Sequence, residues 1–221
     1  MPSAQESADA MRRPLRVAVI DDHLVTTRGV LDVLGEAFDV AETLRAEHVS
    51  EVLADDGHFD FVVLDLRLED GSDPSSNVRL LQGRGWPVLL YTQGSSVEMA
   101  RCIRAGVSAI VTKSEPLEHL VEAATALLGG QPYLSRTWAE ALQASESLPH
   151  LSPRKAEVLR LYAAGLTAKD VAAQLFLAPD TVKDYLAEIR ASFPGEDVRT
   201  KTQLANAAVK YGFADPTSGS R

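Results

Sequence analysis

The sequence predicts two folded parts: a doubly wound α/β domain built on a five-stranded parallel sheet, followed by a small all-α domain of four helices. Two observations predict this. Between residues 15 and 128, short apolar runs alternate five times with segments of helical periodicity, and parallel strands need crossover helices of that kind. From residue 152 onward only helical patterns occur, so the change of period separates the two domains.

The strands and helices of the first domain are expected in strict alternation. Near-continuous apolar runs are typical of parallel strands buried on both faces. The expected strands cover residues 15–20, 38–43, 59–66, 87–92 and 108–112, and the expected helices cover 24–35, 47–55, 75–83, 96–105 and 116–128. The second helix has the weakest pattern. Asp73 and Pro74 supply a cap and a first-turn proline, and Gly106 ends the fourth helix.

The remaining segments complete the domain plan. The stretch GGQPYL breaks the last helix of the first domain, and one helix is expected near 137–144 in the segment that follows. Four further helices are expected, at about 153–164, 168–175, 180–192 and 200–211. The predicted organisation is a disordered tail (1–13), the α/β domain (14–129), a linker (130–150), the helical domain (151–213) and a C-terminal tail (214–221).

Charge differs sharply between the two parts of the 221-residue chain. Its net charge is −9, but residues 1–150 carry 12 Lys and Arg against 23 Asp and Glu, whereas residues 151–221 carry 10 against 8. A net of −11 against +2 indicates different partners. A single cysteine excludes an intramolecular disulfide and fits a reducing compartment. No run approaches the ~20 apolar residues of a membrane helix, so we expect a cytoplasmic protein without membrane contact.

The stretch VIDDHL ends an apolar strand in two adjacent carboxylates, Asp21 and Asp22. One interpretation is structural, because an acid after a strand can accept hydrogen bonds from the first free N–H groups of the next helix. That interpretation accounts for one carboxylate, and a solvated loop would tolerate both. The residues at the ends of the other strands decide between a solvated loop and a ligand-binding site.

Polar side chains stand at the carboxyl ends of four predicted strands: Asp21 and Asp22, Asp65, Thr92 and Lys113. Ligands of open parallel sheets bind beyond these ends, and strands roughly 5 Å apart bring the side chains into one small volume. Three carboxylates together need a cation, and an all-oxygen set suits Mg²⁺. The lysine and the hydroxyl could hold a phosphoryl group. Asp65, single and on the central strand, is the predicted phosphoryl acceptor.

The motifs VIDDH, VVLDL, LLYT and IVTK resemble the receiver domain of two-component response regulators over residues 15 to about 128, a flavodoxin-like fold. The resemblance implies that a partner histidine kinase phosphorylates Asp65. It implies that Asp22, Asp65 and the backbone carbonyl of Arg67 bind Mg²⁺, with Asp21 acting through water. Thr92 and Lys113 are then expected to hold the phosphoryl group.

Two positions depart from the receiver pattern. Receivers usually carry Tyr or Phe three residues before the lysine, an aromatic that turns inward on activation, and here that switch position is Ile110. A small residue usually follows the threonine, and here it is Gln93. The chemistry of the site is compatible with both changes, but slow phosphorylation or a different coupling route becomes plausible.

Residues 151–213, most strongly GLTAKDVAAQLFLAPDTVKDYL, resemble the helix-turn-helix domain of the NarL/LuxR family. The spacing of Val182, Leu186 and Ile189 predicts the buried stripe of its second helix, which in such motifs enters the major groove. The predicted DNA contacts are Lys183, Asp184, Thr181, Lys169, Arg199 and Lys201. The sequence departs from the family at Lys155, Ala178, Asp184, Tyr185 and Ala187. An interaction domain without a DNA role is the alternative, because +2 is modest for a DNA binder.

The last helix, KTQLANAAVKYGF, has two interpretations. It packs onto its own domain, or it also forms a dimer contact, as the family implies, through Leu204, Ala205 and Ala208.

The predicted function is that of a DNA-binding transcriptional response regulator, in which phosphorylation of Asp65 controls dimerisation and DNA binding. One alternative is an atypical regulator that works without phosphorylation, its receiver serving as a ligand-sensing or dimerising platform. An enzyme, such as a Mg²⁺-dependent phosphatase with an aspartyl nucleophile, is disfavoured. Such enzymes place their two acids two residues apart on the first strand, whereas Asp21 and Asp22 are adjacent.

Overall fold

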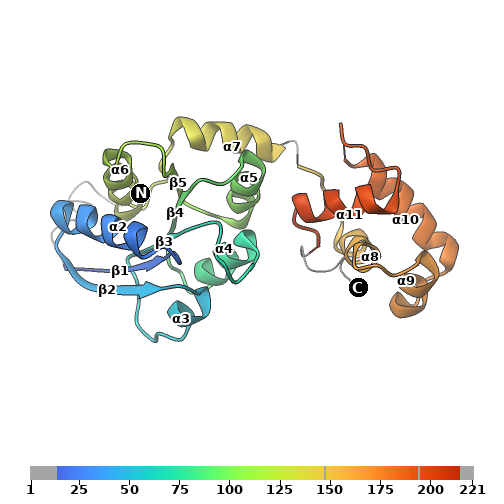
Figure 1. Cartoon of the computed structure of the whole chain (residues 1–221), viewed down its shortest axis with the longest axis horizontal. Coiled ribbons are helices and arrows are strands. Elements are labelled where there is room, and N and C mark those ends of the chain that lie inside the picture. Colours follow the sequence, from blue (N-terminus) through green and yellow to red (C-terminus); the bar gives the residue numbers. More distant parts are fainter. Residues whose placement is uncertain (1–13, 147, 194, 215–221) are drawn as a thin grey trace. The chain divides into compact units, whose positions relative to one another are not determined.

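The computed structural model describes residues 14–146, 148–193 and 195–214, and the chain divides into two compact units, residues 1–145 and 146–221. Figure 1 draws both units. The tail predicted at 1–13 and all but the first residue of the tail predicted at 214–221 lie outside the described residues. No helix in the described part of the chain is both long and apolar enough to cross a membrane.

The first unit is a five-stranded parallel sheet in the order β2-β1-β3-β4-β5. The strands are β1 (Leu15–Ile20), β2 (Val40–Ala46), β3 (Phe61–Leu64), β4 (Val88–Thr92) and β5 (Ala109–Thr112). The helices between and after them are α2 (Leu24–Ala37), α3 (Val49–Leu53), α4 (Pro74–Gln82), α5 (Ser96–Ala105) and α6 (Glu118–Leu128). The predicted doubly wound α/β fold is therefore confirmed.

Two apolar layers hold the helices against the sheet. On one face, Val30 and Leu34 of α2 and Leu120 of α6 pack with the buried side chains of the strands. On the other face, α3, α4 and α5 contribute a second cluster that contains Val52 and Leu81. Figure 1 shows α2 and α6 on one side of the sheet and α3, α4 and α5 on the other. Each central strand is therefore buried on both faces, as its continuous apolar run requires.

Strand β2 differs from the strand expected at 38–43. It spans Val40–Ala46, and most of its residues are exposed. The expectation that every strand is buried on both faces is wrong for this one, because β2 pairs only with β1 and forms an edge of the sheet. Its polar residues, such as Glu42 and Arg45, are compatible with that place.

Local signals in the sequence set the helix ends. The side chain of Asp73 accepts a hydrogen bond from Ser76 N at 2.9 Å, and Pro74 occupies the first turn of α4. Gly106 follows α5 with φ of +100°, a left-handed conformation that glycine adopts without strain. The weak helix expected at 47–55 is α3, five residues long.

The helix expected near 137–144 is α7 (Arg136–Glu146), and it packs on the first unit. Ala141 is fully buried in the cluster beneath α5, and Trp138 is half-buried against it. Arg104 of α5 donates a hydrogen bond from Nη2 to the carbonyl of Ser145 at 2.5 Å. Much of the segment between the two predicted domains is thus built into the first unit.

The second unit contains α8 (Pro153–Ala163), α9 (Ala168–Leu175), α10 (Pro179–Ala191) and α11 (Lys201–Lys210). All four expected helices are present within one or two residues of their predicted ends. Thr167 caps α9 in a capping box with Asp170, and Thr200 caps α11 with Gln203. The four helices share one apolar core, separate from the two clusters of the first unit.

Candidate functional site

Four neighbouring strands bring the predicted acidic site together. Asp21, Asp65 and Lys113 directly follow β1, β3 and β5, and Thr92 is the last residue of β4. Because these strands are adjacent and parallel, their carboxyl ends share one edge of the sheet. The backbone N–H of Lys113 donates to the carbonyl of Thr92 at 2.8 Å, which joins the last two strand ends.

Lys113 bridges two of the carboxylates. Its Nζ lies 2.8 Å from Asp21 Oδ2 and 2.7 Å from Asp65 Oδ2. The three side chains are only 16%, 4% and 7% exposed for Lys113, Asp21 and Asp65. Burial lowers the pKa of Lys113, but the hydrogen bonds to Asp21 and Asp65 outweigh it and the net shift is upward. The lysine is therefore held as an ammonium ion that offsets the repulsion between the two acids.

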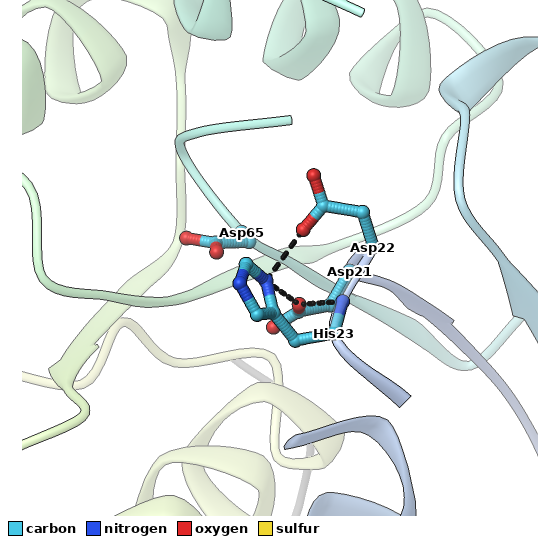
Figure 2. A group of neighbouring side chains, drawn as sticks. All are labelled: Asp21, Asp22, His23 and Asp65. Carbon is cyan, nitrogen blue, oxygen red and sulfur yellow. Dashed lines mark hydrogen bonds and ion pairs between the residues drawn. The ribbon is translucent and has the colours of Figure 1, made fainter. Parts of the chain in front are cut away.

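Asp22 lies on the other side of the same group of acids. Its Oδ2 accepts a hydrogen bond from Glu69 N at 2.7 Å. Its Oδ1 is buried and, among the described residues, accepts no hydrogen bond of regular geometry, although His23 Nδ1 lies 2.6 Å away. Figure 2 shows the His23 ring facing the carboxylates of Asp21, Asp22 and Asp65.

His23 is a member of the site that the sequence pattern did not predict. Its Nδ1 also lies 3.3 Å from Asp21 Oδ1, and its backbone N–H donates to the same oxygen at 2.8 Å. The close contact with Asp22, together with the charges of Asp22 and Asp21, raises the pKa of the imidazole. Its position in the sequence, directly after two acids at a strand end, is the signal that could have placed it in the site.

The interpretation of the two acids as helix caps is wrong. The N-cap of α2 is His23, whose side chain makes no capping hydrogen bond. Asp21 instead accepts from the backbone N–H of His23, outside the helix, and also contacts Lys113. The adjacent carboxylates therefore serve the edge of the sheet rather than the helix that follows.

A pocket of about 350 Å³ opens beside Asp65. Its lining residues are His23, Thr26, Asp65, Arg67, Thr92, Gln93 and Lys113. Arg67, expected to contribute its backbone carbonyl, is one of these residues, and its side chain pairs with Glu98 at 3.2 Å. Gln93 is exposed at the pocket wall, the place where it could narrow the approach to Asp65.

The donor set fits a hard divalent cation. One ligand atom from each of Asp21, Asp22, His23 and Asp65 lies within 4.8 Å of all the others. The buried Asp22 Oδ1 without a regular hydrogen bond is an atom that a cation would satisfy. Carboxylate oxygens are the ligands that Mg²⁺ prefers, and the three acids outnumber the lysine that offsets them.

The switch position, Ile110, is fully buried in the cluster beneath α5. Its carbonyl accepts a hydrogen bond from Ser135 Oγ at 3.3 Å. An aliphatic side chain here has no hydroxyl to exchange between a buried and an exposed partner. The position is nevertheless connected through its backbone to the segment that precedes α7.

In the second unit, α9 and α10 form the expected pair of helices joined by a tight turn. Phe176 follows α9 with φ of 54°, a left-handed conformation, and α10 begins at Pro179. Val182, Leu186 and Ile189 are buried, as their spacing predicted. Lys183, Asp184, Ala187 and Ala191 are exposed, and Thr181 is half-buried. Arg190 is half-buried and donates to the carbonyl of Val198 at 3.2 Å.

Three of the predicted DNA-binding cations have partners within the unit. Lys183 Nζ lies 2.9 Å from Asp180 Oδ1, and Arg199 Nε lies 2.9 Å from Asp197 Oδ1. Lys201 Nζ donates to the carbonyls of Gly165 and Leu166 at 2.6 and 2.8 Å, beyond the end of α8. Lys169 is exposed near the start of α9 and has no ion pair among the described residues.

The exposed face of α10 is acidic. Asp180, Asp184 and Glu188 are all exposed and follow one another at intervals of four residues, so they share one face of the helix. Glu188 pairs with Lys155, the lysine that stands where the family usually has a glutamate. The helix expected to approach DNA therefore presents three carboxylates.

Leu204 and Ala208 of α11 are fully buried in the core of their own unit. Neither side chain is accessible at the surface of the unit, so the dimer role predicted for them stays a prediction. Ala205 is half-buried and is the one of the three candidates with surface to offer.

Comparisons with known proteins agree with both halves of this description. A model of the response regulator receiver domain matches residues 17–125, and a model of the bacterial regulatory proteins of the luxR family matches residues 149–194. The fold is similar to that of RcsB from Salmonella enterica serovar Typhimurium bound to the promoter P1flhDC in the presence of the phosphomimetic BeF3⁻. That match has a TM-score of 0.62 at 18% identity, and it covers 90% of this chain and 99% of the other.

Relatives match along most of their length. The DNA-binding transcriptional activator DevR/DosR of Mycobacterium tuberculosis is 31% identical over 208 residues, which cover 89% of this chain and 95% of that protein. The transcriptional regulatory protein LiaR of Bacillus subtilis is 27% identical over 210 residues, 86% and 95% of the two chains. With its acidic receiver site and its helix-turn-helix unit, the chain belongs to the NarL/LuxR family of two-component response regulators, which are DNA-binding transcription regulators.

Proposed function

We propose that a partner histidine kinase phosphorylates Asp65 and that the phosphorylation controls dimerisation and DNA binding by the second unit. The observation that carries the proposal is the pocket in which the carboxylate of Asp65 meets Thr92 and Lys113. A phosphohistidine on the kinase would transfer its phosphoryl group to a carboxylate oxygen of Asp65, forming an acyl phosphate and leaving neutral histidine. The protein would act in the cytoplasm, where its DNA is.

Three residues of the pocket would take part in this transfer. Asp65 supplies the attacking oxygen. Thr92 Oγ1 accepts a hydrogen bond from Gly94 N at 3.0 Å, which leaves its hydroxyl hydrogen to donate to a phosphoryl oxygen. Lys113, now shared between Asp21 and Asp65, would turn its ammonium toward the new phosphoryl charge.

Mg²⁺ held by Asp22, Asp65 and the carbonyl of Arg67, with Asp21 acting through water, would supply the positive charge that lets the acids and the phosphoryl group stay ionised together. His23 stands beside the same oxygens and would have to turn away from Asp22 Oδ1 to leave room. Its 66% exposed side chain has solvent to turn into.

In the second unit, α10 would enter the major groove, with Thr181, Lys183 and Asp184 facing the bases. Lys169 supports a phosphate contact best, because it is exposed near a helix start. Arg199 and Lys201 could join only by leaving their present partners, Asp197 and two backbone carbonyls.

The test is covalent labelling of the full chain with acetyl phosphate and Mg²⁺, read by intact mass. We expect a phosphoryl adduct on the wild type and none on Asp65→Asn, because the amide is not nucleophilic. Asp32→Asn makes the same change on the exposed face of α2 and should label normally. Labelled protein should dimerise in sedimentation and bind promoter DNA more tightly than unlabelled protein. An adduct on Asp65→Asn at the wild-type rate, or no adduct on the wild type, would refute the proposal.

A further inference from the structure

The segment that leads into α7 runs along β5, the strand that ends next to Lys113. β5 forms an edge of the sheet. Tyr133 pairs with Ala109 as a parallel bridge, and its N–H donates to the carbonyl of Ser108 at 3.1 Å. Ser135 Oγ then donates to the carbonyl of Ile110 at 3.3 Å. The segment therefore covers part of the edge that β5 would otherwise leave open.

One carboxylate joins this segment to the loop that carries Lys113. Glu115 Oε2 accepts hydrogen bonds from Thr112 N at 2.6 Å and from Thr112 Oγ1 at 3.0 Å. Glu115 Oε1 accepts from Thr137 Oγ1, in the first turn of α7, at 3.1 Å. A single side chain thus connects the residue before Lys113 to the start of α7.

The rest of α7 lies on the face formed by α5 and β5. Trp138 and Ala141 pack in the cluster that contains Met99, Cys102 and Ile110. At the far end of the helix, Arg104 of α5 holds the carbonyl of Ser145. Figure 1 shows α7 beside α5 and β5. The tie at the first turn and the tie at Ser145 are hydrogen bonds, and Trp138 and Ala141 supply the apolar contact between them.

We propose that α7 is a releasable cover of the α5–β5 face, and that Glu115 is the latch through which the state of Asp65 reaches it. The inference rests on the proposed phosphorylation of Asp65. When Lys113 leaves Asp21 and Asp65 for a phosphoryl group, residues 112–115 move with it. Glu115 then cannot keep both Thr112 and Thr137, and the first turn of α7 loses its tie.

This route does not use an aromatic switch. With Ile110 buried and aliphatic, the signal passes along the Lys113 loop to Glu115 and Thr137. Because the second unit follows α7 in the chain, release of the helix lengthens the tether between receiver and DNA-binding unit, which sets how readily two DNA-binding units can meet.

Hydrogen exchange of the full chain, followed by mass spectrometry of peptides covering residues 133–146, tests the latch. Three proteins are compared with the wild type: Thr137→Val, Glu115→Gln and the control Glu140→Gln. The control removes an exposed ion pair with Arg136 on the same helix and should exchange like the wild type. Loss of one hydrogen bond should speed exchange of α7 roughly fivefold in Thr137→Val without phosphorylation. Glu115→Gln keeps one acceptor oxygen for Thr112, and its amide can donate to the Thr137 hydroxyl, so it should exchange at a rate between those of the wild type and Thr137→Val.

The second part of the experiment compares exchange of α7 with and without phosphorylation. Wild type labelled with acetyl phosphate and Mg²⁺ should show α7 exchange as fast as unlabelled Thr137→Val, and labelling should add little to that variant. An adduct on the wild type with unchanged exchange of α7 would overturn the latch and leave the proposed function standing. Exchange of Thr137→Val equal to that of Glu140→Gln would also overturn it. No adduct on the wild type would overturn the proposed function, and the latch with it.

Discussion

At the scale of single residues, Lys113 holds together a site that is short of positive charge. Its ammonium contacts Asp21 and Asp65, while the buried Oδ1 of Asp22 lies 2.6 Å from His23 Nδ1. Removing one partner of a buried ion pair costs more than the pair contributes, because the remaining charge stays buried without compensation. The stability of the first unit should therefore depend on this one side chain.

We predict that Lys113→Met lowers the free energy of unfolding of the first unit by about 3 kcal/mol. Mg²⁺ should restore part of that loss, because a cation can replace the missing charge among Asp21, Asp22 and Asp65. Urea unfolding with and without Mg²⁺ measures both effects. Lys210→Met, which breaks a half-exposed pair with Glu196, is the control and should change stability by less than about 1 kcal/mol. Equal losses in the two variants would refute the argument.

At the scale of elements, α4 and α5 are joined by an ion pair at the start of α4. Asp73 caps α4 through Ser76 N and contacts Arg101 of α5. Burial raises the pKa of Asp73, but the hydrogen bond from Ser75 and the charge of Arg101 outweigh it, and the pKa lies below its usual 3.8. The pKa of Asp73 is lower in the folded protein than in the unfolded protein. The stabilisation by its charge is therefore complete above the unfolded pKa and disappears as the pH falls through the folded pKa.

We predict that Asp73→Asn destabilises the protein by about 1–2 kcal/mol at pH 7, because asparagine keeps the cap but loses the charge opposite Arg101. The difference between variant and wild type should shrink as the pH falls below about 4. Urea unfolding at several pH values measures it. Asp32→Asn, at an exposed site on α2, should show no such pH dependence. A difference that stays constant down to pH 2 would contradict the role of the charge.

The acidic face of α10 should weaken DNA binding. Asp184 either repels phosphates or accepts a hydrogen bond from a cytosine amino group. We expect repulsion, because Asp180 and Glu188 lie on the same face and Asp180 already neutralises Lys183. Asp184→Ala should then strengthen binding to operator and scrambled DNA alike, by roughly fivefold or about 1 kcal/mol at low salt.

Fluorescence anisotropy with both DNAs at two salt concentrations separates the two mechanisms. The gain should diminish at the higher salt, since screening weakens repulsion. Asp32→Ala removes the same charge from the first unit and should leave DNA affinity nearly unchanged. Weaker binding of Asp184→Ala to the operator alone would instead establish Asp184 as a base reader.

At the scale of the whole molecule, the two units have separate apolar cores. Among the described residues, the cluster of possible metal ligands, Asp21, Asp22, His23 and Asp65, lies in the first unit only. A ligand that binds one folded unit stabilises that unit by mass action, by about 2.7 kcal/mol at one hundred times its dissociation constant. Calorimetry should therefore show two transitions, of which Mg²⁺ raises only one. A shift of both transitions together would mean that the units unfold as one.

The sequence by itself determined the elements and where the site lies. Apolar runs flanked by helical periods predict a buried parallel sheet, and the carboxyl ends of neighbouring strands must share an edge. The convergence of Asp21, Asp65 and Lys113 could therefore be expected without coordinates. The buried stripe of α10 followed from its 3.6-residue period in the same way. Both inferences use regularities that are local to an element.

Only the tertiary structure decided which partners each charged group has. Examples are the pairing of Lys113 with two acids, the contact of His23 with Asp22, the hydrogen bonds of Lys201 to two backbone carbonyls and those of Glu115 to Thr112 and Thr137. These contacts join residues distant in sequence or depend on the rotamer of one side chain. The exposure of β2 depends on its place at the edge of the sheet, which strand order alone sets. No periodic pattern encodes such contacts, because many folds of similar hydrophobic pattern could leave the same charges free or paired.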